Sequence, residues 1–317
     1  MKYNILLYYC YSKIEDVEAY REEHHLFCIE NNLKGRIIIA EEGLNGTVSG
    51  TPEDCDKYMA YIKADGRFNH VEFKVEPSNS HAFAKIHVRV KPEIVHSGLH
   101  EINPNVATGA YVEPEEFRKI LQDEPEDTVI LDVRSNYEHK VGKFKNAVTL
   151  DIENFRDFPA KLGELDQYRD KKVITYCTGG IKCEKASAYL LEQGFENVHQ
   201  LHGGIIKYGI EAEGEDFEGK CYVFDSRVVK EVNTVNPKVI SKCYVTGEAS
   251  DRMVNCANPT CNIHIPMSEE GARIYNGCCS EVCMNHPDVR SYDGSGAYAR
   301  KTNGYNPYNG WKTIERN

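Results

Sequence analysis

A cysteine followed by two glycines, between an apolar run and a helical segment, is the feature of this sequence with the clearest chemical meaning. The segment reads Val-Ile-Thr-Tyr-Cys-Thr-Gly-Gly-Ile-Lys-Cys-Glu over residues 173–184. The apolar run before Cys177 predicts a buried strand, and the residues after the glycines predict a helix that starts near Cys183. Open α/β sheets bind ligands at the carboxyl ends of their strands. We therefore expect Cys177 to face a binding site.

The loop after Cys177 predicts surroundings that favour a thiolate. Gly179 and Gly180 allow the backbone to curl so that successive N–H groups point inward, and the positive end of the following helix faces the same spot. Both effects lower the pKa of a thiol. The candidate loop residues are Thr178, Gly179, Gly180, Ile181, Lys182 and Cys183. This cradle suits a nucleophilic thiolate, a persulfide or a bound oxyanion, whereas packing alone does not readily explain two glycines after a structural cysteine.

Two further residues near this loop have alternative interpretations. Cys183 lies six residues after Cys177, so it could resolve a sulfenate or persulfide into a disulfide, or simply pack beneath the loop. His202, in a Leu-His-Gly-Gly run, could act as a base, but a histidine packed beside a glycine pair is more often structural. We interpret His202 as structural.

The elements that position the loop predict an α/β protein. Strands alternating with helices over residues 110–225 indicate a mainly parallel sheet covered on both faces. Before it, residues 1–92 predict a ferredoxin-like or acylphosphatase-like α+β domain, in which one strand covers residues 71–75. Residues 93–109 are broken by proline and glycine and predict a linker. Residues 226–317 are rich in cysteine, asparagine and glycine and predict a small domain that needs a metal or docking to hold it.

Half of the 12 cysteines lie in that last region, which favours a metal site over secreted-type disulfides. Two pairs separated by about a helix length suit tetrahedral zinc. The four candidate ligands are Cys256, Cys261, Cys279 and Cys283. Four thiolates leave no open position, so this zinc would be structural. Cys243 is a further candidate, with Thr246 where a second knuckle cysteine would stand, and a set of free thiols is the alternative.

Charge and the chain ends limit the partners. The formal net charge of -11 argues against a broadly basic nucleic-acid surface but allows a local positive path that uses Lys85, Arg89 and Lys91. The first ten residues are too short to span a bilayer and lack a cleavage pattern, so no membrane association and a cytoplasmic location are expected. The segment 299–312 mixes positive charge with aromatics and either stacks on bases or folds back with Trp311 as an anchor.

At this point residues 110–225 resemble the rhodanese family. The resemblance rests on an Asp-Val-Arg run at 132–134, on Glu138, on Gly-Lys-Phe-Lys-Asn-Ala at 142–147, on the loop at 177–182 and on Leu-His-Gly-Gly-Ile at 201–205. It implies that Cys177 accepts sulfur or does related thiol chemistry, and that Asp132 and Arg134 support the loop. The six-residue loop has the length associated with sulfurtransferases. Lys182 stands where many rhodaneses have arginine, and supplies a point charge instead of a bidentate fork.

Over nearly its whole length the chain resembles the rhodanese-domain tRNA uridine hydroxylases. The additional motifs are Glu-Gly-Leu-Asn-Gly-Thr-Val-Ser-Gly at 42–50 and Asn-Cys-Ala-Asn-Pro-Thr-Cys-Asn at 255–262. This resemblance implies oxygen-dependent formation of 5-hydroxyuridine at the wobble position of the tRNA anticodon loop. Molecular oxygen would be the co-substrate, and Cys177 falls on the family's essential cysteine.

Three functions remain in competition from the sequence alone. In a hydroxylase, Cys177 could add to C6 of uridine and activate C5, or could carry the oxidising equivalent as a persulfide or peroxide adduct. In a sulfurtransferase, Cys177 would form a persulfide from thiosulfate or another persulfide donor. A binding-only adaptor is the third interpretation, but it would not need the intact nucleophile loop. No flavin, haem or nicotinamide motif is visible in the sequence.

Overall fold

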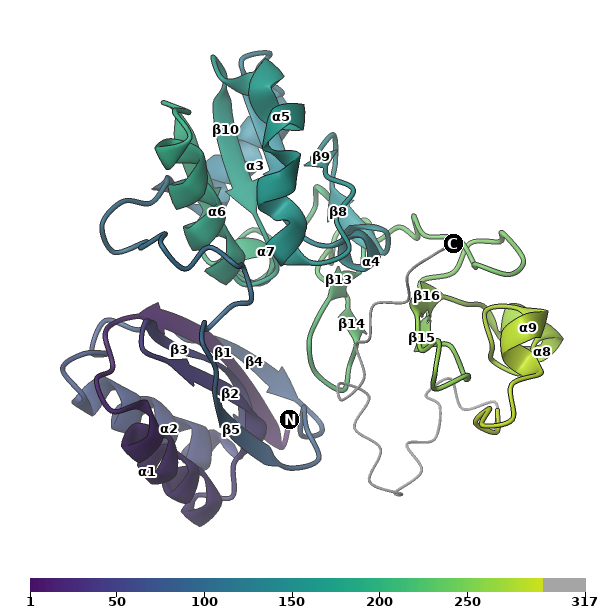
Figure 1. The fold of residues 1–317 in the computed structure, drawn as a ribbon, viewed down its shortest axis with the longest axis horizontal. Helices are drawn as coiled ribbons and strands as arrows, with labels where there is room; N and C mark the ends of the chain where they lie inside the picture. The colour runs from purple at the N-terminus through teal and green to yellow at the C-terminus, as the bar shows by residue number, and fades with distance from the viewer. Residues whose placement is uncertain (293–317) are drawn as a thin grey trace.

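The computed structural model describes residues 1–292. The N-terminal part of the chain forms one sheet with two helices on one face (Figure 1). The strand order is β4-β1-β3-β2-β5, antiparallel except for the β2–β5 pair. The elements are β1 (Tyr3–Tyr11), α1 (Val17–Glu30), β2 (Lys34–Ala40), β3 (Gly43–Gly50), α2 (Pro52–Ala64), β4 (Lys74–Ser78) and β5 (Ile86–Val90). The segment 299–312, for which the sequence offered two interpretations, lies outside the described residues.

Alternation along β1 separates the two faces of this sheet. Leu6, Tyr8 and Cys10 are buried in the core with residues from α1 and α2. The side chains between them, including Leu7 and Tyr9, project to the other face, because successive strand residues point to opposite sides. That other face is turned toward the second sheet of the protein in Figure 1.

The strand predicted at residues 71–75 forms instead at Lys74–Ser78, further along the chain. Val71 and Phe73 pack against the core on the helix side of the sheet. In the structure Lys74 and Glu76 are buried, and Val75 is 38% exposed. Lys74 and Glu76 lie on the other face, where Lys74 contacts Gly179 and Glu76 accepts from Arg227, so charged side chains are buried there by later parts of the chain.

The central part of the chain forms a five-stranded parallel sheet in the order β6-β11-β10-β7-β9. Helices lie on both faces, so the α/β class predicted from the sequence is confirmed. The elements are β6 (Ala110–Val112), α3 (Pro114–Asp123), β7 (Thr128–Asp132), α4 (Asn136–His139), β8 (Gly142–Phe144), β9 (Val148–Thr149), α5 (Leu162–Leu165), β10 (Lys172–Tyr176), α6 (Ile181–Glu192), β11 (Val198–Leu201) and α7 (Gly204–Glu211).

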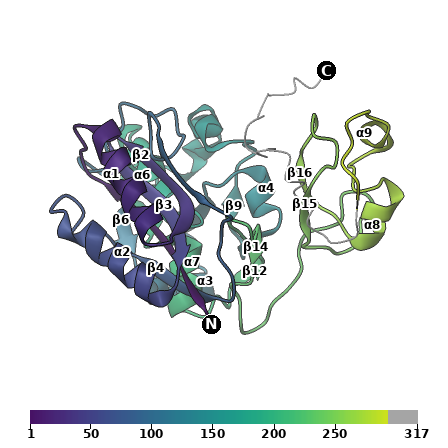
Figure 2. The same cartoon turned by 90° about the horizontal axis from the view of Figure 1, so that it is seen from below.

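The C-terminal part has little regular structure. Its elements are β12 (Phe217–Gly219), which pairs with β8, and β13 (Cys221–Tyr222), β14 (Val229–Lys230), β15 (Met253–Asn255), β16 (His264–Pro266), α8 (Glu269–Ile274) and α9 (Glu281–Met284). Figures 1 and 2 both place α8 and α9 on the side of the molecule away from the N-terminal sheet. Among residues 1–292, no helix has the length and apolar character needed to cross a membrane.

Candidate active site

The Cys177 thiol lies in the cradle that the sequence predicted, at the carboxyl end of β10. Gly180 precedes α6 with a φ of 102°, a left-handed conformation that favours glycine. This turn directs the Gly180 N–H toward Cys177, with 3.2 Å between the nitrogen and Sγ. The Cys177 residue is only 1% exposed. Backbone geometry and burial together hold the sulfur at the amino end of α6.

The surroundings of Cys177 favour the anionic form in spite of burial. Burial alone would raise the pKa of Cys177, but four interactions oppose it: a hydrogen bond from the Cys183 thiol, the charge of Lys182, and the backbone N–H groups of Lys182 and Gly180. Their combined effect lowers the pKa to about 6. The pKa of Cys183 is raised, first by burial and then by its contact with Cys177. Cys183 is therefore the donor and Cys177 the thiolate.

This assignment predicts a titration near pH 6. A lowered thiol pKa means that the anion persists as the pH falls, until the pH passes the pKa itself. We expect the ultraviolet thiolate absorbance of the wild type, after subtraction of the same signal from Cys177→Ser, to be present at pH 7 and to disappear with a midpoint near pH 6. A midpoint near the ordinary thiol value of about 8.5 would contradict the assignment.

Asp132 and Arg134 form a fully buried ion pair beneath the loop. The Arg134 Nη2 lies 2.7 Å from Asp132 Oδ2 and 2.7 Å from the Gly142 carbonyl oxygen. The Tyr176 hydroxyl donates to the same Asp132 oxygen at 2.6 Å. Tyr176 directly precedes Cys177, so this network fixes the end of β10 from which the loop departs.

Lys182 is held close to the loop by a buried carboxylate. Its Nζ lies 2.5 Å from Oε2 of Glu138, and Glu138 is fully buried. Glu138 also accepts the Ser135 N–H, which completes a capping box at the start of α4. Lys182 thus adds positive charge beside Cys177, but it is already paired and is not a free anion-binding fork.

The N-terminal sheet covers the Cys177 loop, a contact that sequence reasoning missed. Lys74 of β4 donates to the Gly179 carbonyl with 3.1 Å between Nζ and the oxygen. A Cβ on Gly179 would stand 2.9 Å from a Leu7 methyl carbon, and one on Gly180 would stand 2.8 Å from the Tyr9 hydroxyl. The glycines therefore serve two purposes, because they shape the loop and admit a second domain. Burial lowers the pKa of Lys74 to about 8.

Glu184, in the first turn of α6, collects donors from both sheets. Tyr9 donates to it at 2.9 Å from the N-terminal sheet. Tyr111, Thr108 and Gln200 donate from the central domain and its linker, at 2.7, 2.9 and 3.0 Å. The sequence signal that could have indicated this network was a glutamate directly after the loop. Its partners lie up to 175 residues away in the chain.

Both ring nitrogens of His202 lie within contact distance of carboxylates. Nε2 lies 3.0 Å from Glu72 of the N-terminal domain, and Nδ1 lies 2.7 Å from Glu113. Lys207 pairs with the same two carboxylates. These contacts across the two domains agree with a structural role for His202.

The four cysteines chosen from the sequence lie together. The sulfurs of Cys256, Cys261, Cys279 and Cys283 are all within 4.8 Å of one another. Two of the separations are 3.8 and 3.6 Å, for Cys261–Cys279 and Cys279–Cys283. Four thiolates at about 2.3 Å from a tetrahedral zinc ion would stand about 3.8 Å apart, so the donor set and its spacing fit zinc.

Cys243, the further candidate from the sequence, is not part of this group. Its sulfur accepts hydrogen bonds from the Ser268 hydroxyl at 3.3 Å and from the Thr246 N–H at 3.4 Å. It is buried in a separate small apolar cluster with Val254 and Met267. Cys243 and Thr246 therefore belong to the packing around α8.

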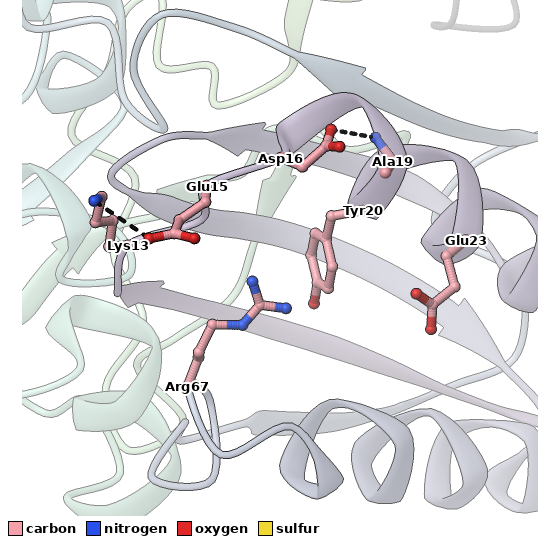
Figure 3. Close-up of a pocket in the computed structure, with 7 residues that line it drawn as sticks. All are labelled: Lys13, Glu15, Asp16, Ala19, Tyr20, Glu23 and Arg67. Carbon is pink, nitrogen blue, oxygen red and sulfur yellow. Dashed lines mark hydrogen bonds and ion pairs between the residues drawn. The ribbon is translucent and has the colours of Figure 1, made fainter.

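A shallow pocket on the N-terminal domain lies apart from this chemistry (Figure 3). Its volume is about 480 Å³, and its lining residues are Lys13, Glu15, Asp16, Ala19, Tyr20, Glu23 and Arg67. These residues belong to α1 and to the turns beside it. The side of the sheet that α1 covers is opposite to the side that contacts Cys177. The pocket lining contains no thiol and is not a candidate for the reaction.

Three family models match successive parts of the chain. Residues 3–94 match a UPF0176 acylphosphatase like domain, residues 113–211 match a Rhodanese-like domain, and residues 218–284 match a Rhodanase C-terminal domain. The first two descriptions agree with the architectures of the N-terminal and central domains.

Curated relatives cover nearly the entire chain. A protein named tRNA uridine(34) hydroxylase from Cytophaga hutchinsonii is 66% identical over 306 residues, which is 96% of this chain and 97% of the relative. A protein of the same name from Enterococcus faecalis is 50% identical over 92% of both chains. One from Listeria welshimeri is 50% identical over 90% of both chains. The similarity therefore includes all three parts of the chain.

Proposed function

This chain belongs to the tRNA uridine(34) hydroxylase family, a family of oxidoreductases, and we propose that it hydroxylates C5 of the wobble uridine with Cys177 as the covalent nucleophile. The observation that carries the assignment of Cys177 is a buried sulfur at the amino end of α6 that accepts the Gly180 N–H at 3.2 Å, in surroundings that lower its pKa to about 6. A thiolate at neutral pH is the form that attacks carbon. The substrate is the anticodon loop of tRNA, and the cytoplasm is the compartment where this tRNA would be met.

The proposed reaction begins with addition of the Cys177 thiolate to C6 of uridine. The new C6–S bond moves electron density to C5, which then forms a bond to oxygen. Molecular oxygen supplies that atom, and its second atom leaves as water with two electrons and two protons from an external donor. Loss of the C5 proton and departure of the Cys177 thiolate restore the C5–C6 double bond. The Gly180 N–H and the Cys183 thiol stabilise the departing thiolate, because both donate to the sulfur.

Nucleoside mass spectrometry of tRNA tests this function. In cells that lack the gene, we expect 5-hydroxyuridine and its derivatives at the wobble position to fall, and the wild-type gene to restore them. Growth under isotopically labelled molecular oxygen should place the label in the nucleoside. If the label enters from water instead, the oxygen-dependent route is wrong.

Sulfur transfer is the second candidate, because the same amide cradle suits a persulfide anion at Cys177. It predicts turnover of thiosulfate or a persulfide donor, and unchanged wobble uridines in the deletion strain. The tRNA measurement therefore distinguishes the two functions.

We also propose that the four-cysteine group of the C-terminal region holds a structural zinc ion. The expected zinc content of purified wild-type protein is about one equivalent per chain. Cys279→Ser should lose most of that zinc, because it removes the sulfur whose separations from two neighbours fit the tetrahedron best. Cys243→Ser is the matched control and should keep the wild-type content, since Cys243 lies outside the group. Equal zinc content in both variants would contradict the site.

A further inference from the structure

The proposed reaction requires more room at Cys177 than this structure provides. Cys177 is 1% exposed, and Leu7, Tyr9 and Lys74 of the N-terminal sheet lie against the loop that follows it. Formation of a carbon–sulfur bond needs direct contact between the sulfur and C6 of uridine. A uracil ring cannot reach a sulfur that the protein covers, so part of the covering must move before the reaction begins.

The covering sheet is joined to the rest of the chain on one side. The linker follows β5, and residues 91–109, all of which the structure describes, form neither a helix nor a strand. Glu42 and Asn45 of the N-terminal domain bind the backbone of Ile94 in this linker. Lys185 of α6 binds Glu42 and two further linker carbonyls. These contacts tie the linker to both domains, so a rotation between the domains would be centred there.

The opposite side of the sheet is held by ion pairs with later parts of the chain. In the sheet order, β4 is the edge strand farthest from β5. Glu72, just before β4, lies 2.9 Å from the Lys207 Nζ. Glu76 of β4 lies 3.1 Å from the Arg227 Nη1 and also pairs with Lys230. We name these five residues the β4 latch.

The contact between the two domains is largely polar. Leu7 packs against the core of the central domain, and Tyr9 packs in a small cluster with Ile181. The other contacts described above are hydrogen bonds and ion pairs, and the Glu72 side chain is 44% exposed. Ion pairs that remain in contact with water contribute little to stability. Domains that meet through a polar interface are expected to move relative to one another.

We propose that the interface between the N-terminal sheet and the Cys177 loop is the entry site for the anticodon strand of tRNA, and that the protein opens it by lifting the β4 edge about the linker. Opening separates Lys230 from Glu76, and Lys207 and Arg227 each lose one of the carboxylates that they contact. Phosphate oxygens of the strand can take the places of these carboxylates. This inference rests on the proposed function, because tRNA is the substrate of that reaction.

Alkylation of Cys177 tests whether the interface opens. The double variant Glu72→Gln with Glu76→Gln weakens the β4 latch, so iodoacetamide should modify Cys177 about fivefold faster than in the wild type, in proportion to the open fraction. At pH 8 the Cys177 thiol, with a pKa of about 6, is already ionised, so the rate reports access and not ionisation. Peptide mass spectrometry identifies the modified residue among the 12 cysteines.

The matched control is Glu22→Gln with Glu53→Gln. It makes the same change in net charge and removes two exposed ion pairs on α1 and α2, on the helix side of the same domain. Its Cys177 should react at the wild-type rate. Cys28, which is fully buried in the N-terminal core, should stay unmodified in every variant that is folded. If Cys28 reacts in the double variant, the single variant Glu72→Gln replaces it, with an expected increase of about twofold.

The affinity for transcribed tRNA tests whether the strand enters at this interface. A partner that binds only the open form gains apparent affinity by the same factor as the open fraction. The latch variant should therefore bind tRNA about fivefold more tightly than the control of equal charge. If Cys177 reacts equally fast in both variants, the domains do not open at β4 and the inference is overturned. It is also overturned if Cys177 reacts faster in the latch variant while both variants bind tRNA equally well.

These measurements do not depend on hydroxylation, so the inference and the proposed function can fail separately. If alkylation and tRNA affinity both rise in the latch variant while the wild type produces no 5-hydroxyuridine, the entry site stands and the reaction is wrong. If neither rises while the wild type produces 5-hydroxyuridine, the reaction stands and uridine reaches Cys177 by another route.

Discussion

Replacement of Cys177 by alanine is expected to lower the rate of uridine hydroxylation by about 10³-fold or more, because it removes the nucleophile from the proposed reaction. Binding of tRNA should be nearly unchanged, since Cys177 is buried and offers almost no surface to a bound RNA. Single-turnover kinetics with purified protein and unmodified tRNA would measure both quantities. Hydroxylation by the Cys177→Ala protein at more than about a tenth of the wild-type rate would rule out covalent catalysis by this residue.

Cys183→Ala is the matched control for this prediction. It removes a second buried thiol of the same loop, but leaves the nucleophile in place. Because the Cys183 thiol is the leading interaction that lowers the pKa of Cys177, its loss should move the Cys177 titration to higher pH. The activity of this variant at pH 6 should therefore fall more than its activity at pH 8. If the two thiols instead form an obligatory disulfide during turnover, both alanine variants will be equally inactive.

Replacement of Asp132 by alanine is expected to destabilise the central domain by about 3–5 kcal/mol, which is typical for removal of one partner from a buried ion pair. The change leaves the fully buried Arg134 guanidinium without its carboxylate and the Tyr176 hydroxyl without its acceptor. Hydrogen exchange of the β7 and β10 amides in increasing urea, detected by mass spectrometry, would measure the loss in the free energy of unfolding. A loss below about 1 kcal/mol would show that the pair contributes little.

The chain provides its own control for this effect. Asp65 and Arg67 form the same local motif, with the arginine N–H, Nε and Nη2 bound to the aspartate two residues before it. The corresponding contacts of Asp132 and Arg134 have nearly the same lengths. However, the Arg67 side chain is 40% exposed and the Arg134 side chain is fully buried. Asp65→Ala should therefore cost at most about 1 kcal/mol, the ordinary value for an exposed pair.

Features encoded within a short segment were predictable from the sequence. The strand before Cys177, the glycine turn and the following helix all depend on neighbouring residues, and they occur as expected. The start of α2 is also local, because the Thr51 side chain accepts the Asp54 N–H and Pro52 occupies the first helical turn. The four clustered cysteines could be selected because their short spacings already restrict how the sulfurs can meet.

Features that depend on contact between domains were not predictable in this way. Lys74 and Gly179 are 105 residues apart, and nothing in the local pattern of β4 indicates that a lysine would be the buried residue. Cys243 was a further candidate ligand, because spacing does not reveal that the Ser268 hydroxyl donates to its sulfur.

We expect the covering of the Cys177 loop by the N-terminal sheet to slow the oxidation of Cys177 in air. A thiol that is anionic at neutral pH is the kind most readily oxidised to sulfinic and sulfonic acids, which cells rarely or never reverse. Leu7, Tyr9 and Lys74 close the space above the loop glycines and leave Cys177 only 1% exposed. We therefore expect the sheet to shield the thiolate from dissolved peroxide between turnovers, and a central domain separated from it to lose its free Cys177 thiol faster on exposure to peroxide.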